Sequence, residues 1–284
     1  MSAAVGILVA ACILVINITR FPWMLNIAIA VVACISIHEI LVATKFINNR
    51  SVVISSFLFT AFLQFIPAFP EAQWMRLIAL SSVVYFMVLF ITLLASHNKM
   101  NVERIGLAMM VTAMIAFPFY SMNYMYWKSP YDGDARYRLV GQALVIGCFL
   151  ISWMTDTFAY FTGMLFGKHK MAPTISPKKT WEGAIGGFIG CVLSVCLIAY
   201  LCTNTFQISN LEVNFVNLII VTMISSVVSM IGDLSFSIIK RCFDIKDFGN
   251  IMPGHGGVLD RFDSVIFVCP VVCIMNIYMP IIIK

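Results

Sequence analysis

The stretch "NFVNLIIVTMISSVVSMIGDLSFSIIKR", residues 214–241, decides the fold class. It carries a single acidic side chain, Asp233, and its two basic residues come only at the end. An apolar segment of about 20 residues is long enough to cross the hydrocarbon core of a membrane as a helix. We therefore expect a membrane-spanning helix over 214–240. This span and the one expected over 139–166 are longer than a bilayer needs, so each either projects into water or tilts.

Comparable apolar runs recur along the whole chain of 284 residues, which is 61% hydrophobic and 11% charged. A soluble domain usually carries about 25% charged residues. The short alternating segments of a transmembrane β-barrel are absent from the sequence. We predict an all-α, polytopic integral membrane protein with about nine spans, at 3–19, 23–43, 52–69, 76–95, 105–122, 139–166, 183–202, 214–240 and 262–283.

The unusual polar chemistry of the chain lies almost entirely after residue 150. We therefore expect residues 1–138 to form N-terminal transmembrane helices and residues 139–284 to form a catalytic transmembrane region. Residues 167–182 and 233–261 are the two richest polar segments.

The distribution of Lys and Arg predicts the orientation, because cytoplasmic loops are enriched in both. With the N-terminus in the cytoplasm, twelve of the 18 basic residues fall on the cytoplasmic side: Lys45, Arg50, Lys99, Arg104, Lys168, Lys170, Lys178, Lys179, Lys240, Arg241, Lys246 and Arg261. This orientation places both rich polar segments on the cytoplasmic face. We expect the cell membrane of a bacterium, since the chain is compact and shows no targeting signal.

The end of the 214–240 span combines acidic, hydroxyl and basic side chains. Asp233 and Ser237 lie four positions apart, and Lys240 and Arg241 follow. On a continuous helix all four share one face. A carboxylate binds Mg²⁺ and cations bind phosphate oxygens, so this face suits a metal and phosphate site. Snorkelling basic residues with a helix cap are the alternative, which explains the two cations well and Asp233 poorly.

The segment "KDFGNIMPGHGGVLDRFD", residues 246–263, interrupts the apolar sequence next. Its glycines let backbone N–H groups approach an anion closely, and His255 lies among them. Asp260 and Asp263 flank Arg261 at the start of the last span. Acidic residues there either complement the helix dipole or supply further metal-binding oxygens, and the two interpretations are compatible.

A third polar segment is "SPKKTWEG", residues 176–183, in which Ser176 and Pro177 are expected to form a turn or a helix cap. Thr180 is placed to cap the seventh span. Lys178 and Lys179 precede that helix N-terminus, where exposed N–H groups attract anions. The bias of cytoplasmic loops toward basic residues would also supply two lysines.

The residues that follow, "GAIGGFIG" at 183–190, place glycines four positions apart. Small residues at this spacing let two membrane helices approach closely. We therefore predict a packing role for these glycines rather than a chemical one.

Asp156, His38 and Glu39 are ionisable groups that lie well inside predicted spans. Charges in a membrane are costly and usually face a cavity or a partner, so Asp156 is expected to bind substrate or support the site. For His38 and Glu39, a role in the site and simple pairing with another buried group both stay open.

Residues 237–263 resemble the signature of the phosphatidate cytidylyltransferases, also called CDP-diacylglycerol synthases. The shared pattern is S-x-x-K-R, four residues, K-D, then P-G-H-G-G-x-x-D-R-x-D. "DTFAYFTGMLFGKHK" (156–170) and "SPKKTWEGAIGG" (176–187) are similar to upstream blocks of that family, and the resemblance is strongest over 152–264. The chain departs from the pattern at Phe236, where many members carry Glu, and this puts a metal ligand or its support in question.

The resemblance implies transfer of a cytidylyl group from CTP to phosphatidate, with Mg²⁺, or alternatively Mn²⁺, as cofactor. It implies metal ligation by Asp233, Asp260 and Asp263, with Ser237 assisting. It implies that His255 contacts a phosphate or helps the leaving group. Phosphate-binding roles are implied for six cations: Lys178, Lys179, Lys240, Arg241, Lys246 and Arg261. The expected partners are the two substrates and the lipid bilayer but no nucleic acid, and a homodimer stays open.

Two other functions compete with this interpretation. A CTP-dependent lipid kinase would need a general base for a hydroxyl acceptor and would release CDP. A transporter would place its polar groups near the middle of the membrane, often with inverted repeats, whereas here they concentrate in loops and no repeat is visible.

Overall fold

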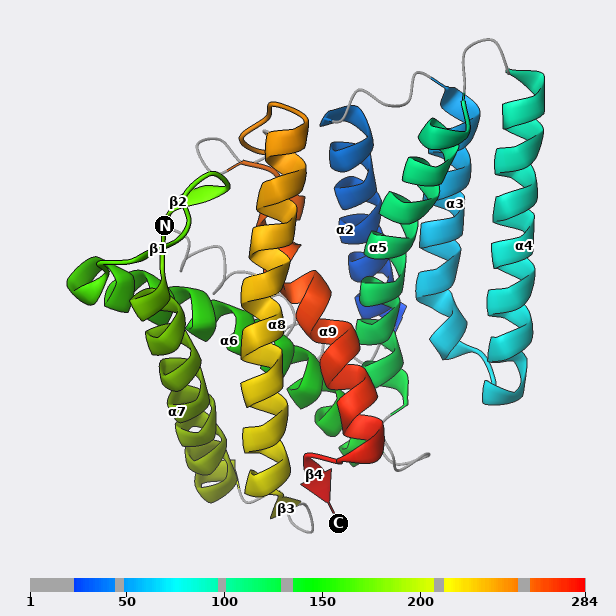
Figure 1. Ribbon diagram of the computed structural model, residues 1–284. Coiled ribbons are helices and arrows are strands. Elements are labelled where there is room, and N and C mark those ends of the chain that lie inside the picture. Colours follow the sequence, from blue (N-terminus) through cyan, green and yellow to red (C-terminus); the bar gives the residue numbers. More distant parts are fainter. Residues whose placement is uncertain are drawn as a thin grey trace. The chain divides into compact units, whose positions relative to one another are not determined.

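The computed structural model describes residues 23–43, 49–96, 101–128, 135–206, 212–249 and 256–283 (Figure 1). Within these ranges, eight helices are long and apolar enough to cross a membrane. The prediction of an all-α integral membrane protein is confirmed, and the first predicted span, 3–19, lies outside the described residues. The chain divides into two compact units: unit 1 comprises 1–130 and 245–262, and unit 2 comprises 131–244 and 263–284.

Unit 1 consists of packed helices, which are named in the order in which they follow along the chain. Its elements are α2 (Trp23–Ala43), α3 (Arg50–Phe65), the 3₁₀ turn η1 (Ile66–Ala68), α4 (Glu71–Ala95), α5 (Val102–Trp127) and the first turn of α9 (Leu259–Tyr278). Asn49 and Asn101 cap α3 and α5 by accepting backbone N–H groups of the following turn. Both asparagines satisfy donors that a helix N-terminus leaves without partners.

Polar side chains join the helices of unit 1 inside its apolar core. The Tyr85 hydroxyl lies 3.0 Å from both Ser56 Oγ and Thr112 Oγ1, which links α4 to α3 and α5. At another level, Gln64 Nε2 donates to Ala116 O at 3.2 Å, and Asn123 Nδ2 donates to Gln64 Oε1 at 3.0 Å. Such bonds hold membrane helices together where apolar contact alone gives little preference over lipid.

Unit 2 contains three long helices, most of α9 and two short antiparallel sheets of two strands each. Its elements are α6 (Ala135–Phe166), β1 (Lys170–Ala172), β2 (Ser176–Thr180), α7 (Trp181–Phe206), β3 (Glu212–Val213), α8 (Phe215–Cys242), α9 from residue 263 onward and β4 (Ile282–Ile283). The expected extra length of the sixth and eighth spans is confirmed by the 32 residues of α6 and the 28 residues of α8.

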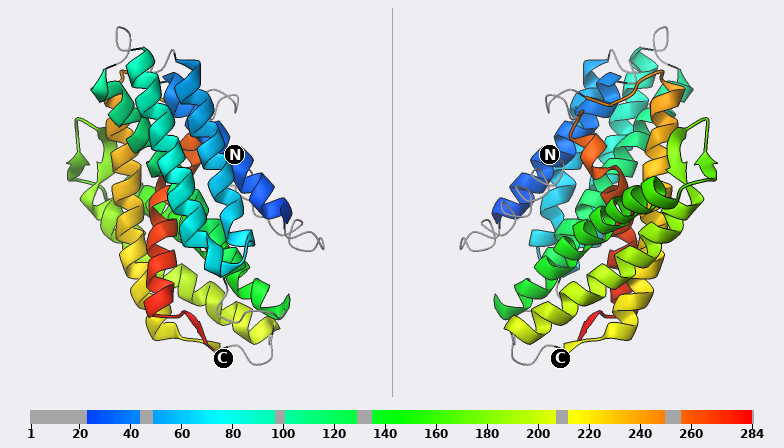
Figure 2. Two further views of the ribbon diagram at one scale, coloured as in Figure 1. Left: turned by 90° about the vertical axis from the view of Figure 1, so that its right-hand side faces the viewer. Right: turned by 90° about the vertical axis from the view of Figure 1, so that its left-hand side faces the viewer.

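The glycines of residues 183–190 bring α6 and α7 into close contact, and the two helices run side by side in the right view of Figure 2. A Cβ built on Gly186 would lie 2.3 Å from the side chain of Thr162, and one built on Gly190 would lie 2.3 Å from Phe158. The predicted packing role of these glycines is therefore confirmed.

The loop between α6 and α7 folds into the antiparallel hairpin β1–β2. The predicted Ser-Pro turn is wrong, because Ser176 opens β2 and pairs with Ala172. A proline is tolerated there since a two-stranded sheet has only edge strands. Thr180 confirms its predicted capping role, since its Oγ1 accepts from Gly183 N at 3.2 Å.

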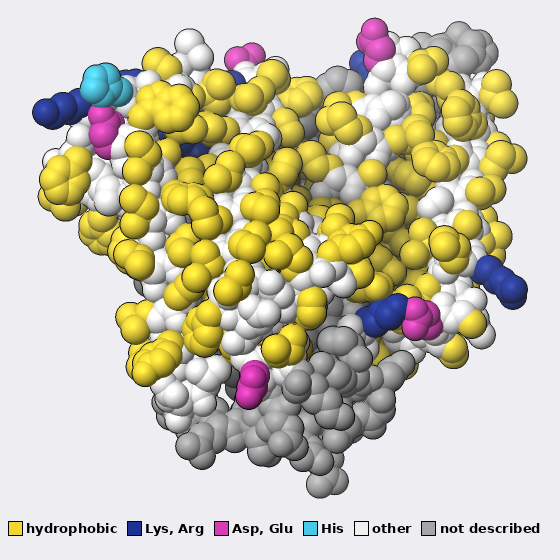
Figure 3. Space-filling view, turned by 60° about the horizontal axis from the view of Figure 1, so that its bottom comes forward, with side chains coloured by type: hydrophobic (Ala, Val, Ile, Leu, Met, Phe, Trp, Pro, Cys, Tyr) yellow, Lys and Arg dark blue, Asp and Glu magenta, His cyan; other side chains and the backbone are white. Residues whose placement is uncertain are grey.

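Hydrophobic side chains cover the described helices over most of the face in Figure 3, and charged side chains lie toward the margins of that view. Helix α4 is an example, since Leu80, Met87 and Leu94 are each more than half exposed. Exposed aliphatic side chains along a whole helix match contact with lipid. The predicted division into an N-terminal and a catalytic region stays a prediction.

Candidate functional site in two polar segments

An ion pair between Lys179 and Asp233 lies at the polar end of unit 2. Lys179 comes from strand β2 and Asp233 from α8, so residues 54 positions apart in the chain meet there. The side chains of Lys179 and Asp233 are 27% and 26% exposed to solvent, so this pair is less solvated than an ordinary surface ion pair. Partial desolvation strengthens the attraction between a cation and an anion.

Two more carboxylates act on this pair, and we call Asp156, Asp233 and Asp263 the carboxylate cluster. Both Asp233 and Asp263 repel the Asp156 carboxylate electrostatically, whereas Lys179 attracts it. Ser264 Oγ lies 3.5 Å from Asp156 Oδ2, and Ser264 N donates to Asp263 Oδ1 at 2.8 Å. Helices α6, α8 and α9 thus bring three acidic groups toward one lysine.

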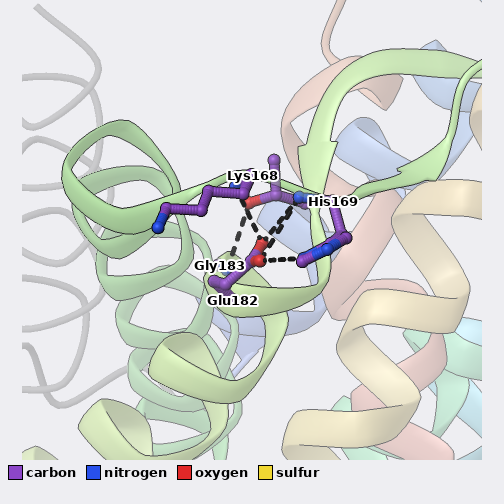
Figure 4. A network of polar contacts seen from close by, with 5 residues as sticks. Lys168, His169, Glu182 and Gly183 are labelled. Carbon is purple, nitrogen blue, oxygen red and sulfur yellow. Dashed lines mark hydrogen bonds and ion pairs between the residues drawn. The ribbon is translucent and has the colours of Figure 1, made fainter.

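The hairpin that carries Lys179 is anchored to α7 by Glu182 (Figure 4). The Glu182 carboxylate accepts from the backbone N–H groups of Lys168 and His169 at 3.2 Å, and His169 Nδ1 lies 2.6 Å from Glu182 Oε1. Sequence reasoning did not single out His169, although an acidic residue in the first turn of a predicted helix was visible. This anchor fixes where the hairpin leaves α6 and returns to α7.

The remaining predicted residues of unit 2 lie around the same end. Lys178 is exposed, because neighbouring residues of a strand point to opposite faces. Arg241 Nε donates to Ile175 O at 3.4 Å and so connects the end of α8 to the hairpin. Ser237 and Lys240 are half-buried on α8. The structure thus brings Lys179 and Asp233 into contact and leaves Lys178 facing solvent.

Phe236 is fully buried in unit 2, and its ring lies edge-on to Phe267 with 6.1 Å between centroids. The side chain at this position therefore packs between α8 and α9 and offers no oxygen to a metal ion.

In unit 1, Asp260 organises the backbone of the motif segment, residues 245–262. Its Oδ2 accepts from Phe248 N at 2.9 Å and from Gly257 N at 3.0 Å. Lys246 is exposed and Arg261 is half-buried, while His255 lies outside the described residues. Metal ligation by Asp260 stays a prediction.

Glu39 of α2 also contacts the motif segment, and it is only 3% exposed to solvent. Its carboxylate accepts from Val258 N at 2.9 Å and from Leu259 N at 2.8 Å. The sequence showed an acidic group inside a span, but its partners lie more than 200 positions away. The neighbouring His38 is exposed instead and lies edge-on to Phe57.

The carboxylate cluster offers oxygen ligands of the kind that Mg²⁺ prefers. No three His, Cys, Asp or Glu side chains in the described ranges are arranged to hold one metal ion. Magnesium at nucleotide sites typically uses one or two carboxylates together with substrate phosphates and water. Asp233 and Asp263 therefore fit a metal that substrate helps to bind, and Lys179 supplies positive charge beside them.

Comparison with known proteins agrees with this chemistry. The model of the cytidylyltransferase family matches residues 1–279. The phosphatidate cytidylyltransferase of Staphylococcus epidermidis is 38% identical over 207 residues, which are 72% of this chain and 72% of the relative. The enzyme of the same name from Staphylococcus haemolyticus is 34% identical over 78% of this chain and 79% of its own. That from Bacillus subtilis is 32% identical over 69% of this chain and 78% of its own. The chain belongs to the cytidylyltransferase family.

Proposed function

We propose that this integral membrane protein transfers the cytidylyl group of CTP to phosphatidate, giving CDP-diacylglycerol and pyrophosphate for phospholipid synthesis. Family membership and the names of its relatives support this activity. A phosphate oxygen of the lipid attacks the α-phosphorus of CTP, and the bond from that phosphorus to the β-phosphate oxygen breaks. The lipid phosphate is already ionised, so the reaction needs no general base.

Both substrates are anions, so binding and positioning depend on neutralising their charge. Lys179 is half-buried and contacts both Asp233 and a phosphate oxygen of the substrate. Lys178 and Arg241 bind phosphate oxygens from the solvent side of the hairpin. Lys240, Lys246 and Arg261 hold further phosphate oxygens, and His255 contacts the leaving pyrophosphate. Asp156 helps to orient the cluster from α6.

Asp233 and Asp263 would hold Mg²⁺, and Asp260 and Ser237 are the further residues that would supply oxygen ligands. When bound, the metal neutralises charge on the phosphate oxygens between which the group is transferred. Mn²⁺ is the alternative cofactor because it accepts similar oxygen ligands.

The observation that carries this proposal is the Lys179–Asp233 ion pair inside the carboxylate cluster. Three acidic groups gather toward one partly exposed lysine, and a divalent cation would balance the negative charge that the lysine leaves. An ordinary structural role at a membrane edge calls for one such pair and leaves the other two carboxylates unexplained.

The position of a label in the lipid product tests the reaction. Purified protein in lipid vesicles is given CTP labelled on the α-phosphate or on the γ-phosphate, with phosphatidate added or omitted. We expect the α-label to enter lipid only when phosphatidate is present. Entry of the γ-label instead would identify a lipid kinase and refute the proposal.

The protein acts in the bacterial cell membrane with its N-terminus and polar loops in the cytoplasm, where CTP is available. The excess of Lys and Arg in those loops supports this orientation. Assembly as a homodimer stays a prediction.

A further inference from the structure

A carboxylate of α2 holds the beginning of α9, and the proposed reaction does not use it. Glu39 Oε1 accepts from Val258 N at 2.9 Å, and Glu39 Oε2 accepts from Leu259 N at 2.8 Å. Helix α9 begins at Leu259, so these two donors are N–H groups at its N-terminus. The first N–H groups of a helix have no partner within the helix and carry partial positive charge.

Glu39 lies where burying a carboxylate without hydrogen-bond partners would be costly. Helix α2 is one of the apolar helices that can span a membrane, and Glu39 is 3% exposed. A charged group in such a helix is expensive unless its environment satisfies it. Two backbone donors at a helix N-terminus satisfy it, since a carboxylate accepts charge-assisted hydrogen bonds on both oxygens.

Two glycines of the motif segment lie directly against this carboxylate. A Cβ built on Gly257 would lie 2.5 Å from Glu39 Oε2, and one built on Gly249 would lie 2.5 Å from Glu39 Oε1. Any side chain at either position would push the carboxylate off its donors. Glycine at both positions therefore leaves the space that the Glu39 carboxylate occupies.

Asp260 makes the corresponding contacts from within the segment. Its Oδ2 binds Gly257 N and Phe248 N, so it joins the backbone on both sides of residues 250–255. Gly256, which has φ of 81°, provides a left-handed turn at this point. Two carboxylates, one of them from a helix more than 200 positions away, thus bind four backbone N–H groups of the motif segment.

We propose that Glu39 is a positioning residue for cytidylyl transfer: its carboxylate fixes the motif segment and the first turn of α9, which carries Asp260 and Arg261. This inference rests on the proposed function for its catalytic consequence, but the contacts themselves are independent of it. Glu39 touches no substrate in this account. It acts by setting where the backbone of the segment begins its helical turn.

The variant Glu39→Gln tests the carboxylate with little change in shape. An amide has one acceptor oxygen and one donor NH₂ group, so one of the two backbone donors would face another donor. We expect kcat to fall by about 10- to 100-fold, as for other residues that orient reactive groups, while the KM for CTP changes far less. Glu71→Gln in α4 is the matched control, because Glu71 pairs with Lys128 at the surface of the same unit.

Gly257→Ala probes the same contact from the other side. If the added methyl group acts by displacing Glu39, then Gly257→Ala and Glu39→Gln together cost little more than either alone. Additive losses would mean that the two residues act independently and would overturn the proposal.

Hydrogen exchange separates this inference from the proposed reaction. In Glu39→Gln we expect faster amide exchange in peptides covering 256–262, with α3 and α4 unchanged. Unchanged exchange, unchanged kcat, or a loss of activity that only follows the folded fraction would each overturn the positioning role. A wild-type protein that makes no CDP-diacylglycerol would instead refute the proposed function, while the exchange result would still decide whether Glu39 holds the segment.

Discussion

At the residue scale, Lys179 and Lys178 are neighbours in sequence but differ in environment. The strand geometry of β2 turns Lys179 toward Asp233 and Lys178 toward solvent. A lysine that binds phosphate beside a carboxylate contributes a charge-assisted hydrogen bond. Under the proposed function we therefore expect Lys179 to contribute more to phosphate binding than Lys178.

Replacing Lys179 by Met tests this difference. We expect Lys179→Met to lower CTP-dependent product formation by about 10- to 100-fold, the equivalent of one hydrogen bond to a charged group. The same substitution at Lys170, which is exposed on β1, serves as the control. Equal activities of the two variants would show that Lys179 has no special role.

Asp233→Asn tests the proposed metal ligand. The amide is a poorer ligand for Mg²⁺ and leaves Lys179 without its carboxylate partner. We expect lower activity and a higher Mg²⁺ concentration for half-maximal activity. Asp244→Asn is a suitable control, because Asp244 has φ of 53° and Asn tolerates this conformation well. An unchanged Mg²⁺ requirement in Asp233→Asn would remove this residue from the metal site.

At the element scale, the α6–α7 contact depends on glycines without side chains. Gly186→Val would place carbon atoms on Thr162, and we expect destabilisation by about 1–3 kcal/mol, as for other overpacked sites. Thermal unfolding in detergent measures the effect. Gly147→Ala in α6 is the control, since a Cβ there meets nothing within 4 Å. A Gly186→Val protein as stable as wild type would mean that the helices can separate freely.

The sequence predicted helices better than it predicted loops. Helix α2 covers the predicted residues 23–43, and the residues on either side of it lie outside the described ranges. Helix α4 begins at Glu71 rather than 76, since a helix can continue past the apolar run into polar residues. The β1–β2 hairpin was missed because a two-stranded sheet outside the membrane leaves no periodic apolar pattern. The partners of Glu39 could not be predicted, because backbone N–H groups have no sequence signal.

At the scale of the whole molecule, the charge distribution predicts that both polar segments face the cytoplasm. Single cysteines replacing Lys178 and Lys246, in a background without reactive native cysteines, test this with a thiol reagent that does not cross membranes. We expect both to react in inverted vesicles and to be protected in intact cells. Gln73→Cys, on the predicted outer side, should show the opposite behaviour. Labelling of only one of the two positions from outside the cell would contradict the orientation.

The most direct test of the account is product stoichiometry with the purified protein. Vesicles containing phosphatidate are supplied with CTP and Mg²⁺, and both pyrophosphate and cytidylyl-labelled lipid are measured. We expect the two products to appear in equal amounts, and both to fall together, still in equal amounts, in Lys179→Met and Asp233→Asn. Release of CDP or free phosphate in place of pyrophosphate, or full turnover in both variants, would contradict the account.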